Sequence, residues 1–298
     1  EAFHNNSIKS LALDGNGDLL AGTDNGLYVY HNDVTPLQHI IHDSRNIQSL
    51  TNNIIWNIFA DQEHNIWLGT DYGISLSRYN SALQFIPISQ ITGTGDGNQF
   101  YSLFRDSKGF YWFGGTNGLI RFTDPAGDKH NAIWYRMGDK TYPLSHNRIR
   151  HIYEDKEQQL WIATDGSINR YDYATRQFVH YNIVDSTGTY NTNWTYYMFE
   201  DNAGHLWIST CLGGIFVVDK HRLMQSASGQ YVAEQNYSVH NGLSGMFINQ
   251  IIPDNEGNVW VLLYNNKGID KINPRTREVT KLFADELNGE KSPNYLLC

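Results

Sequence analysis

Four side chains in this sequence could recognise a ligand rich in hydroxyl groups: Trp56, Arg150, Trp194 and Tyr196. Aromatic faces pack on the apolar C–H faces of sugar rings, and the guanidinium group of Arg donates hydrogen bonds to hydroxyl oxygens. The same side chains could instead fill an internal channel or face water. We predict that they contact an oligosaccharide.

Two tyrosines in expected loops, Tyr72 and Tyr264, complete the predicted ligand contacts. Other aromatic and polar residues of the same loops are Asp71, Tyr142, His146, Tyr190, Asn191 and Asn265. Aromatic residues are also enriched at protein interfaces. Docking against a partner domain is therefore an equally good interpretation of these loops.

The sequence contains no arrangement typical of catalysis or of a metal centre. The twelve His are scattered, without a His-Glu-x-x-His run, and no Gly-x-Ser-x-Gly elbow occurs. The stretch from Asp14 to Asp18 begins like a calcium loop but lacks the Glu at its twelfth position, so we interpret it as a turn. We predict no cofactor, no metal and no enzymatic activity, with a glycan hydrolase or lyase as the minor alternative.

Charge and composition exclude several partners. The formal net charge is −9, and no block of Lys and Arg could neutralise a row of phosphates, so we predict no contact with nucleic acid or membrane. Cys211 and Cys298 are too few for a disulfide framework and are not spaced like zinc ligands. No apolar run approaches the roughly 18 residues of a membrane span. Any export or anchoring signal would lie outside this chain.

A sequence repeat supplies the elements that must position the candidate residues. Its central acidic residue recurs as Asp14, Asp61, Asp106, Asp155, Asp201 and Asp254. Six residues later come Trp67, Trp112, Trp161, Trp207 and Trp260, whereas the first copy has Leu20. This spacing is typical of a four-stranded propeller blade of about 45 residues. We interpret the Asp and the following Gly as turn residues and the Trp as packing between neighbouring blades.

We therefore predict an all-β fold, a β-propeller of four-stranded blades that forms a single domain over residues 1–298. The chain holds six repeats, and Ser292–Cys298 reads as the first strand of a further blade. Propellers close at about four to eight blades, so we predict a seven-bladed ring whose last blade is truncated here. Ligands usually bind where the innermost strands and the loops between blades converge.

The candidate residues fall at that predicted channel mouth. The position five residues before the repeated Asp varies, and its occupants are Lys9, Trp56, Tyr101, Arg150, Tyr196 and Asn249. Such a mixture suits a channel lining better than a core. Trp194 lies at the entry to an innermost strand, whereas Trp134 falls on an outer strand and is expected to serve packing.

The segments Ile55–Tyr79 and Ile149–Tyr171 resemble the two-component regulator propeller repeat, and the resemblance extends over nearly the whole chain. It implies the periplasmic sensor region of a Bacteroidetes hybrid two-component system, part of an inner-membrane sensor histidine kinase. It further implies an oligosaccharide ligand and contact with an adjacent propeller and a β-sandwich of the same protein. A homodimer is also compatible with it. The alternative is a scaffold or dimerisation propeller that binds no ligand.

Overall fold

The computed structural model describes residues 7–31, 36, 38–79, 85–87, 98–123, 132–141, 143–226, 230–264 and 268–282. These residues are almost entirely in strands and turns, which confirms the predicted all-β class. The chain forms two compact units, the first ending at Tyr135 and the second beginning at Arg136. The predicted strand at 292–298 lies outside the described residues, so the seventh blade and the single domain stay predictions.

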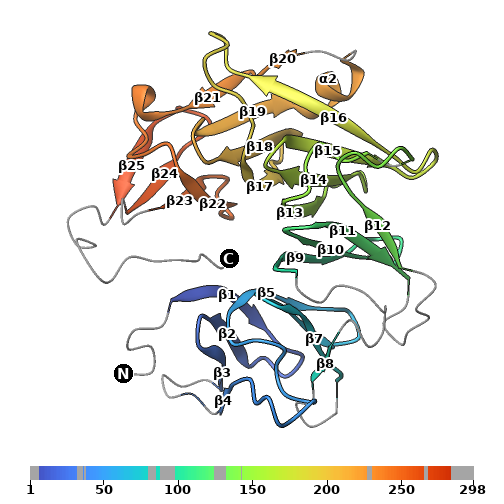
Figure 1. The fold of residues 1–298 in the computed structure, drawn as a ribbon. Helices are drawn as coiled ribbons and strands as arrows, with labels where there is room; N and C mark the ends of the chain where they lie inside the picture. Colours follow the sequence, from blue (N-terminus) through green and yellow to red (C-terminus); the bar gives the residue numbers. More distant parts are fainter. Residues whose placement is uncertain are drawn as a thin grey trace. The chain divides into compact units, whose positions relative to one another are not determined.

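The first unit contains three four-stranded sheets (Figure 1). Their strands are β1 (Ile8–Leu13), β2 (Leu19–Thr23), β3 (Gly26–Tyr30) and β4 (Gln38–Ile40), then β5 (Ile55–Ala60), β6 (Ile66–Thr70), β7 (Gly73–Ser77) and β8 (Phe85–Pro87), then β9 (Phe100–Arg105), β10 (Tyr111–Gly115), β11 (Gly118–Phe122) and β12 (Ile133–Tyr135). Each sheet is an antiparallel meander in chain order. One sheet therefore corresponds to one sequence repeat, as predicted for a blade.

The second unit repeats this plan three times, with one addition. Its strands are β13 (Ile149–Glu154), β14 (Leu160–Thr164), β15 (Ser167–Asp172) and β16 (Gln177–Val184), then β17 (Thr195–Glu200), β18 (His205–Thr210), β19 (Ile215–Asp219) and β21 (Gln235–Tyr237), then β22 (Ile248–Pro253), β23 (Val259–Leu263), β24 (Ile269–Ile272) and β25 (Val279–Leu282). Between β19 and β21 the chain forms helix α2 (Lys220–Gln225) and strand β20 (Gln230–Val232). Strand β20 pairs in parallel with the end of β16, so the fourth sheet gains a fifth strand from the repeat that follows it.

The repeated Asp and Trp are joined by a hydrogen bond that the sequence reading did not foresee. In the second repeat, Asp61 Oδ1 accepts the backbone N–H groups of Glu63 and Asn65, while its Oδ2 accepts the indole N–H of Trp67 at 2.9 Å. The same indole bond occurs at Trp112, Trp161, Trp207 and Trp260, at 2.7 to 3.0 Å. One carboxylate thus closes the turn and orients the ring.

The Trp rings fill the space between neighbouring sheets, as predicted. Trp67 is fully buried and packs against Tyr111 and Phe113 of the next sheet, with ring centroids 5.1 and 5.3 Å away. The second and third strands that carry this core are mostly buried on both faces, so they read as continuous apolar runs. The first strands are only partly buried at several positions, which leaves side chains such as Trp56 partly exposed.

The Thr that ends the second strand of most repeats closes the next turn. Thr70 Oγ1 accepts the N–H of Tyr72 and donates to the carbonyl of Gly73. Gly73 has φ +91°, which favours glycine, and it begins the third strand. In the fourth repeat Ser167 stands in this place with φ +77°, bonded in the same way to Thr164. A non-glycine residue is retained there despite the strain.

We expect Trp112→Phe to lower the free energy of unfolding by about 2 to 3 kcal/mol, because it leaves the Asp106 carboxylate without a buried, charge-assisted hydrogen bond. The matched control is Trp260→Phe, which removes the same bond at a partly exposed ring, where water can replace the donor. Urea denaturation measures both losses. Equal losses at the two positions would contradict the expectation that the buried hydrogen bond contributes more to stability than the partly exposed one.

Candidate functional site

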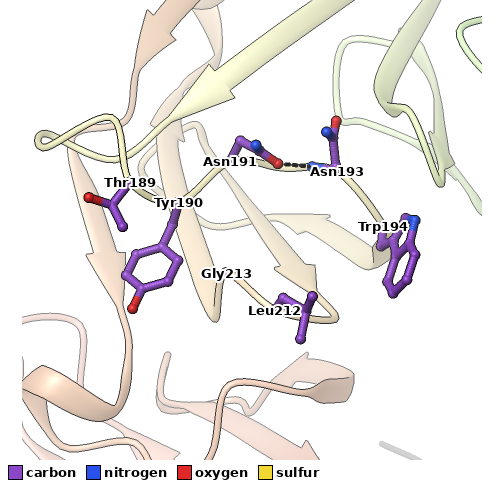
Figure 2. A pocket seen from close by; sticks show the side chains of 7 residues that line it. All are labelled: Thr189, Tyr190, Asn191, Asn193, Trp194, Leu212 and Gly213. Atoms are coloured by element: carbon purple, nitrogen blue, oxygen red, sulfur yellow. Dashed lines mark hydrogen bonds between the residues drawn. The ribbon is translucent and has the colours of Figure 1, made fainter.

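A pocket of about 310 Å³ lies in the second unit, between the loop after β16 and the turn that joins β18 to β19 (Figure 2). Its lining residues are Thr189, Tyr190, Asn191, Asn193, Trp194, Leu212 and Gly213. Trp194 and Leu212 are 48% and 66% exposed, so two large apolar side chains of the same pocket lining are open to solvent. In Figure 2, Leu212 lies between Tyr190 and Trp194.

The loop that forms the pocket is ordered by its own hydrogen bonds. Buried Asp185 accepts the N–H of Tyr190 at 2.8 Å and the hydroxyl of Thr187, and these bonds keep its pKa below the usual range although burial alone would raise it. Asn191 accepts the N–H of Asn193 at 2.9 Å. Because these polar groups are fixed before any ligand arrives, the pocket is largely preformed.

Two backbone hydrogen bonds hold Trp194 in place. Its N–H donates to the carbonyl of Asp165 in the fourth sheet, and its own carbonyl accepts the N–H of Cys211, both at 3.0 Å. Its φ is +55°, a left-handed backbone conformation that residues other than Gly and Asn rarely adopt. The two bonds hold an exposed indole in place, and the strain makes the position a candidate for function.

A row of aromatic rings lies where the first strands of the fifth and sixth sheets begin. The Arg150 guanidinium is bonded to Asp165 at 2.7 Å and lies over the Tyr196 ring at 4.5 Å. Tyr196 meets Phe247 edge to face at 5.3 Å, and Phe247 stacks on the half-exposed Tyr264 at 4.4 Å. Burial raises the pKa of Tyr196 above its usual value despite the nearby Arg150, so its hydroxyl remains a neutral donor at neutral pH.

The first unit contains a comparable inner cluster. The Trp56 indole donates to Asp71 at 3.0 Å, Gln99 donates to the same carboxylate oxygen, and the Tyr101 hydroxyl donates to Gln99. The ammonium group of Lys9 lies 4.8 Å from the Trp56 ring centre. These polar groups largely satisfy one another, which favours a structural lining over a ligand site for Trp56.

The structure brings together four of the six predicted ligand contacts. Arg150, Tyr196 and Tyr264 belong to the aromatic row, and Trp194 joins it through the backbone of Asp165. The remaining two, Trp56 and Tyr72, belong to the other unit, and Tyr72 is an exposed turn residue. Ligand contact by all six stays a prediction.

Phe247 and Leu212 are site residues that the sequence reading missed. Phe247 lies seven residues before Asp254, and Trp194 lies seven residues before Asp201, so the two share one repeat position. This position varies between the repeats, like the position five before the Asp, and that variation is the sequence signal for Phe247. Leu212 belongs to a turn that is one residue longer than its counterparts in the first four repeats. Among the described residues, no group of three or more His, Cys, Asp or Glu is close enough to hold a metal ion.

The repeats match a known family model, the two component regulator propeller, at residues 49–72, 94–117 and 143–166. The chain carries two component regulator propeller repeats. Each matched segment runs from the end of one loop through the turn Asp and the Trp to the turn before the third strand. The match therefore covers the framework of the blade, and the Trp194 pocket lies outside the matched residues.

The chain is similar to parts of longer proteins. The chain is 95% identical, over its full length, to the extracellular domain of the hybrid two component system BT4673 of B. thetaiotaomicron, with a TM-score of 0.70. It is 23% identical to that of BT3049 over 93% of its length, with a TM-score of 0.73. It is also 27% identical over 63% of its length to histidine kinase P4 of Formosa agariphila. The chain spans 40% and 34% of the two solved extracellular-domain chains and 13% of the histidine kinase.

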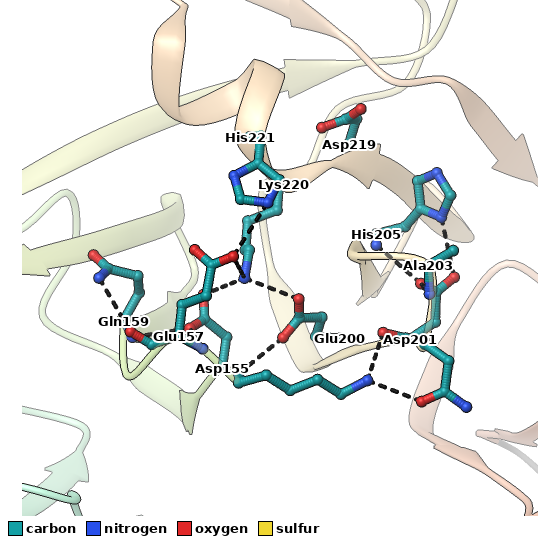
Figure 3. A network of polar contacts seen from close by, with 12 residues as sticks. Asp155, Glu157, Gln159, Glu200, Asp201, Ala203, His205, Asp219, Lys220 and His221 are labelled. Atoms are coloured by element: carbon teal, nitrogen blue, oxygen red, sulfur yellow. Dashed lines mark hydrogen bonds and ion pairs between the residues drawn. The ribbon is translucent and has the colours of Figure 1, made fainter.

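A second polar cluster ties two blades of the repeat array to helix α2 (Figure 3). The ammonium group of fully buried Lys220 lies 2.8 Å from Glu200 and 3.2 Å from Asp155, which also accepts the Trp161 indole. Burial lowers the pKa of Lys220, but the bond to Glu200 and the charge of Asp155 outweigh it, so the net shift is upward. A fully buried cation held between two buried carboxylates from neighbouring repeats marks the cluster as structural.

Lys220→Met should destabilise the protein by about 3 to 5 kcal/mol, because two buried carboxylates would lose their cation. The control is Lys156→Met, since exposed Lys156 bonds only the carbonyl of Asp201 and the side chain of Asn202 through its ammonium group. That variant should lose less than about 1 kcal/mol. Chemical denaturation measures the free energy of unfolding of both variants. Similar small losses would show that the buried ion pairs of Lys220 do not stabilise the protein.

His151 should make stability fall in acid. Its ring stacks on Tyr197 at 3.8 Å, its Nδ1 accepts the N–H of Met198, and burial lowers its pKa to about 3. Below pH about 6.5 this histidine binds a proton in the unfolded chain but stays neutral in the folded protein. The free energy of unfolding is therefore highest above pH about 6.5 and decreases as the pH falls toward about 3. Between pH 7 and pH 5 the loss should be about 2 kcal/mol greater than in His151→Phe. Parallel pH profiles for the two proteins would refute this.

Proposed function

We propose that this chain is the oligosaccharide-binding sensor propeller of a hybrid two-component signalling protein. On this proposal it lies outside the inner membrane, in the periplasm, and kinase parts beyond this chain produce the output. The chain itself would bind and relay a signal without catalysing a reaction. Among the described residues no helix is long and apolar enough to cross a membrane.

The single observation that carries this proposal is the exposed Trp194 at the edge of a preformed polar pocket. A fixed indole offers a flat apolar face to a sugar ring, while Thr189, Tyr190 and Asn193 offer hydroxyl and amide groups to its hydroxyls. No charged side chain belongs to the lining. A neutral sugar is therefore favoured over a uronic acid or a sulfated sugar, whose charge would lack a partner.

The relatives support the cellular setting. Two of them are extracellular domains of hybrid two component systems, and a third is a histidine kinase. Because this chain matches only part of each of them, a sensor domain that acts on distant kinase parts fits the comparison. Contact with neighbouring domains of the same protein, and a homodimer, belong to the same proposal.

The position of Trp194 suggests how binding would be relayed. Its backbone links a turn of the fourth sheet to a turn of the fifth, and the side chain of Asp165 in the first of these turns holds Arg150 against Tyr196. A ligand that favours one arrangement of these loops shifts the population toward it. The relay would thus begin as a change in contacts between neighbouring blades.

A scaffold function is the second candidate. Leu212 and Val239 are 66% and 45% exposed, and Tyr190 approaches His240 in the same turn as Val239. Exposed apolar side chains that lie near one another often mark a protein interface. In that case the edge of the pocket would be covered by another domain, and no sugar would bind.

Trp194→Ala should weaken binding of a neutral oligosaccharide by about 1 to 3 kcal/mol, because a stacked aromatic face supplies much of a sugar site's contact. The matched control is Tyr79→Ala, an exposed aromatic of the first unit that is 43% exposed. Isothermal titration of neutral and acidic oligosaccharides against both variants measures the effect.

Three results would count against the proposal. Binding of acidic sugars in preference to neutral ones would remove the argument from the uncharged lining. An equal loss in Tyr79→Ala would show that the effect is not local to the pocket. No saturable binding by any oligosaccharide would favour the scaffold function.

A further inference from the structure

The fourth repeat keeps a serine where the other repeats have glycine at the start of the third strand. The glycines at this position are Gly26, Gly73, Gly118, Gly214 and Gly268, with φ between +74° and +103°. Ser167 has φ +77° and is 1% exposed. A side chain in this region strains the backbone, and glycine would relieve the strain. Local geometry alone therefore does not account for the serine.

The Ser167 hydroxyl contacts the pocket loop. Its Oγ donates to the carbonyl of Tyr181 at 2.8 Å and lies within hydrogen-bond distance of the Thr192 hydroxyl. Thr192 is fully buried, its N–H donates to the carbonyl of Ile183, and its own carbonyl accepts the Thr195 hydroxyl at 2.6 Å. The loop is thus fixed at Thr192 from three sides, one of which is Ser167.

Thr192 directly precedes two residues of the pocket, Asn193 and Trp194. Trp194 is itself in a left-handed conformation, so small movements of Thr192 would redirect its indole. The other bonds of Trp194 run to backbone groups in turns, at Asp165 and Cys211. Ser167 provides a side-chain contact from the fourth sheet to the residue that begins this strained segment.

We propose that Ser167 is a positioning residue that holds the pocket loop in its binding arrangement. It acts through Thr192 and does not touch the ligand. The inference rests on the proposed sugar site, because it assigns Ser167 a role in preparing that site. Strain at Ser167 is retained because the hydroxyl preorganises Trp194, and preorganisation raises affinity by reducing the ordering that binding requires.

The proposal makes stability and binding respond differently to Ser167→Gly. Glycine relieves the strained φ, so the melting temperature should stay equal or rise. Loss of the hydroxyl frees the loop, so affinity for a neutral oligosaccharide should fall by about tenfold. Ser167→Ala keeps the strain without the hydroxyl and should lose affinity with a lower melting temperature. A residue with only a structural role would lose stability and affinity together.

A second measurement needs no ligand. In protein labelled with 5-fluorotryptophan, the Trp194 signal is assigned by Trp194→Phe, and it should shift or broaden in Ser167→Gly while the other Trp signals stay in place. The matched control is Ser209→Ala, which removes a buried serine hydroxyl bonded to the carbonyl of Tyr197 in the fifth sheet. This variant should leave the Trp194 signal unchanged.

The two measurements separate the possible failures. If the Trp194 signal is the same in wild type, Ser167→Gly and Ser167→Ala, the positioning role is wrong. If it changes but the wild type binds no oligosaccharide, the sugar site is wrong while the coupling of Ser167 to Trp194 stands. Unchanged affinity in a Ser167→Gly protein whose Trp194 signal has changed would overturn the claim that this coupling prepares the site.

Discussion

The hydrogen bond between the turn carboxylate and the indole of the next strand is the interaction on which the rest of the structure depends. The same carboxylate closes the first hairpin of the blade by accepting backbone N–H groups, and its bond to the indole holds the ring that fills the space to the next blade. Together these bonds stabilise a charge that would otherwise be costly to bury. At Asp254, bonds from Asn258 and Trp260 outweigh burial and lower the pKa to about 2. The Asp254 carboxylate therefore remains ionised at neutral pH.

Because one carboxylate performs these tasks in successive repeats, the loops at the opposite ends of the strands are free to vary. The pocket lies at these loops, beside the turn that contains Leu212 and the strained residue Trp194. The inserted segment with α2 and β20 lies in the same repeat, and buried Lys220 ties it to the turn residue Asp155 and to Glu200 at the end of β17. The bond between the turn Asp and the indole recurs in the second to sixth repeats, whereas the inserted segment and the Trp194 pocket belong to the fifth repeat and the loop that precedes it.

Lys9 and Arg150 are equivalent residues with different surroundings. Lys9 and Arg150 share one repeat position, and each lies near an aromatic ring of the next blade. Beside Lys9, the side chains of Trp56, Asp71 and Gln99 are bonded to one another. Beside Arg150, the aromatic row continues to the half-exposed Tyr264. A ligand could reach the second arrangement more readily than the first.

The sequence by itself determined the framework. The repeated Asp, Gly and Trp predicted the hairpin, the four-stranded sheet and the packing of the Trp between sheets, because these features depend on local turn chemistry and on a spacing visible in one chain. The positions of Trp194 at a strand entry and of Trp134 on an outer strand were also predictable.

Only the tertiary structure decided which variable residues meet. Phe247 joins Tyr196 to Tyr264, Ser167 reaches Thr192, and Lys220 reaches Asp155 across distances in sequence that no local pattern encodes. The physical reason is that hydrogen bonds and ring contacts depend on side-chain direction, and strained backbone at Ser167 and Trp194 is maintained by neighbours from other strands.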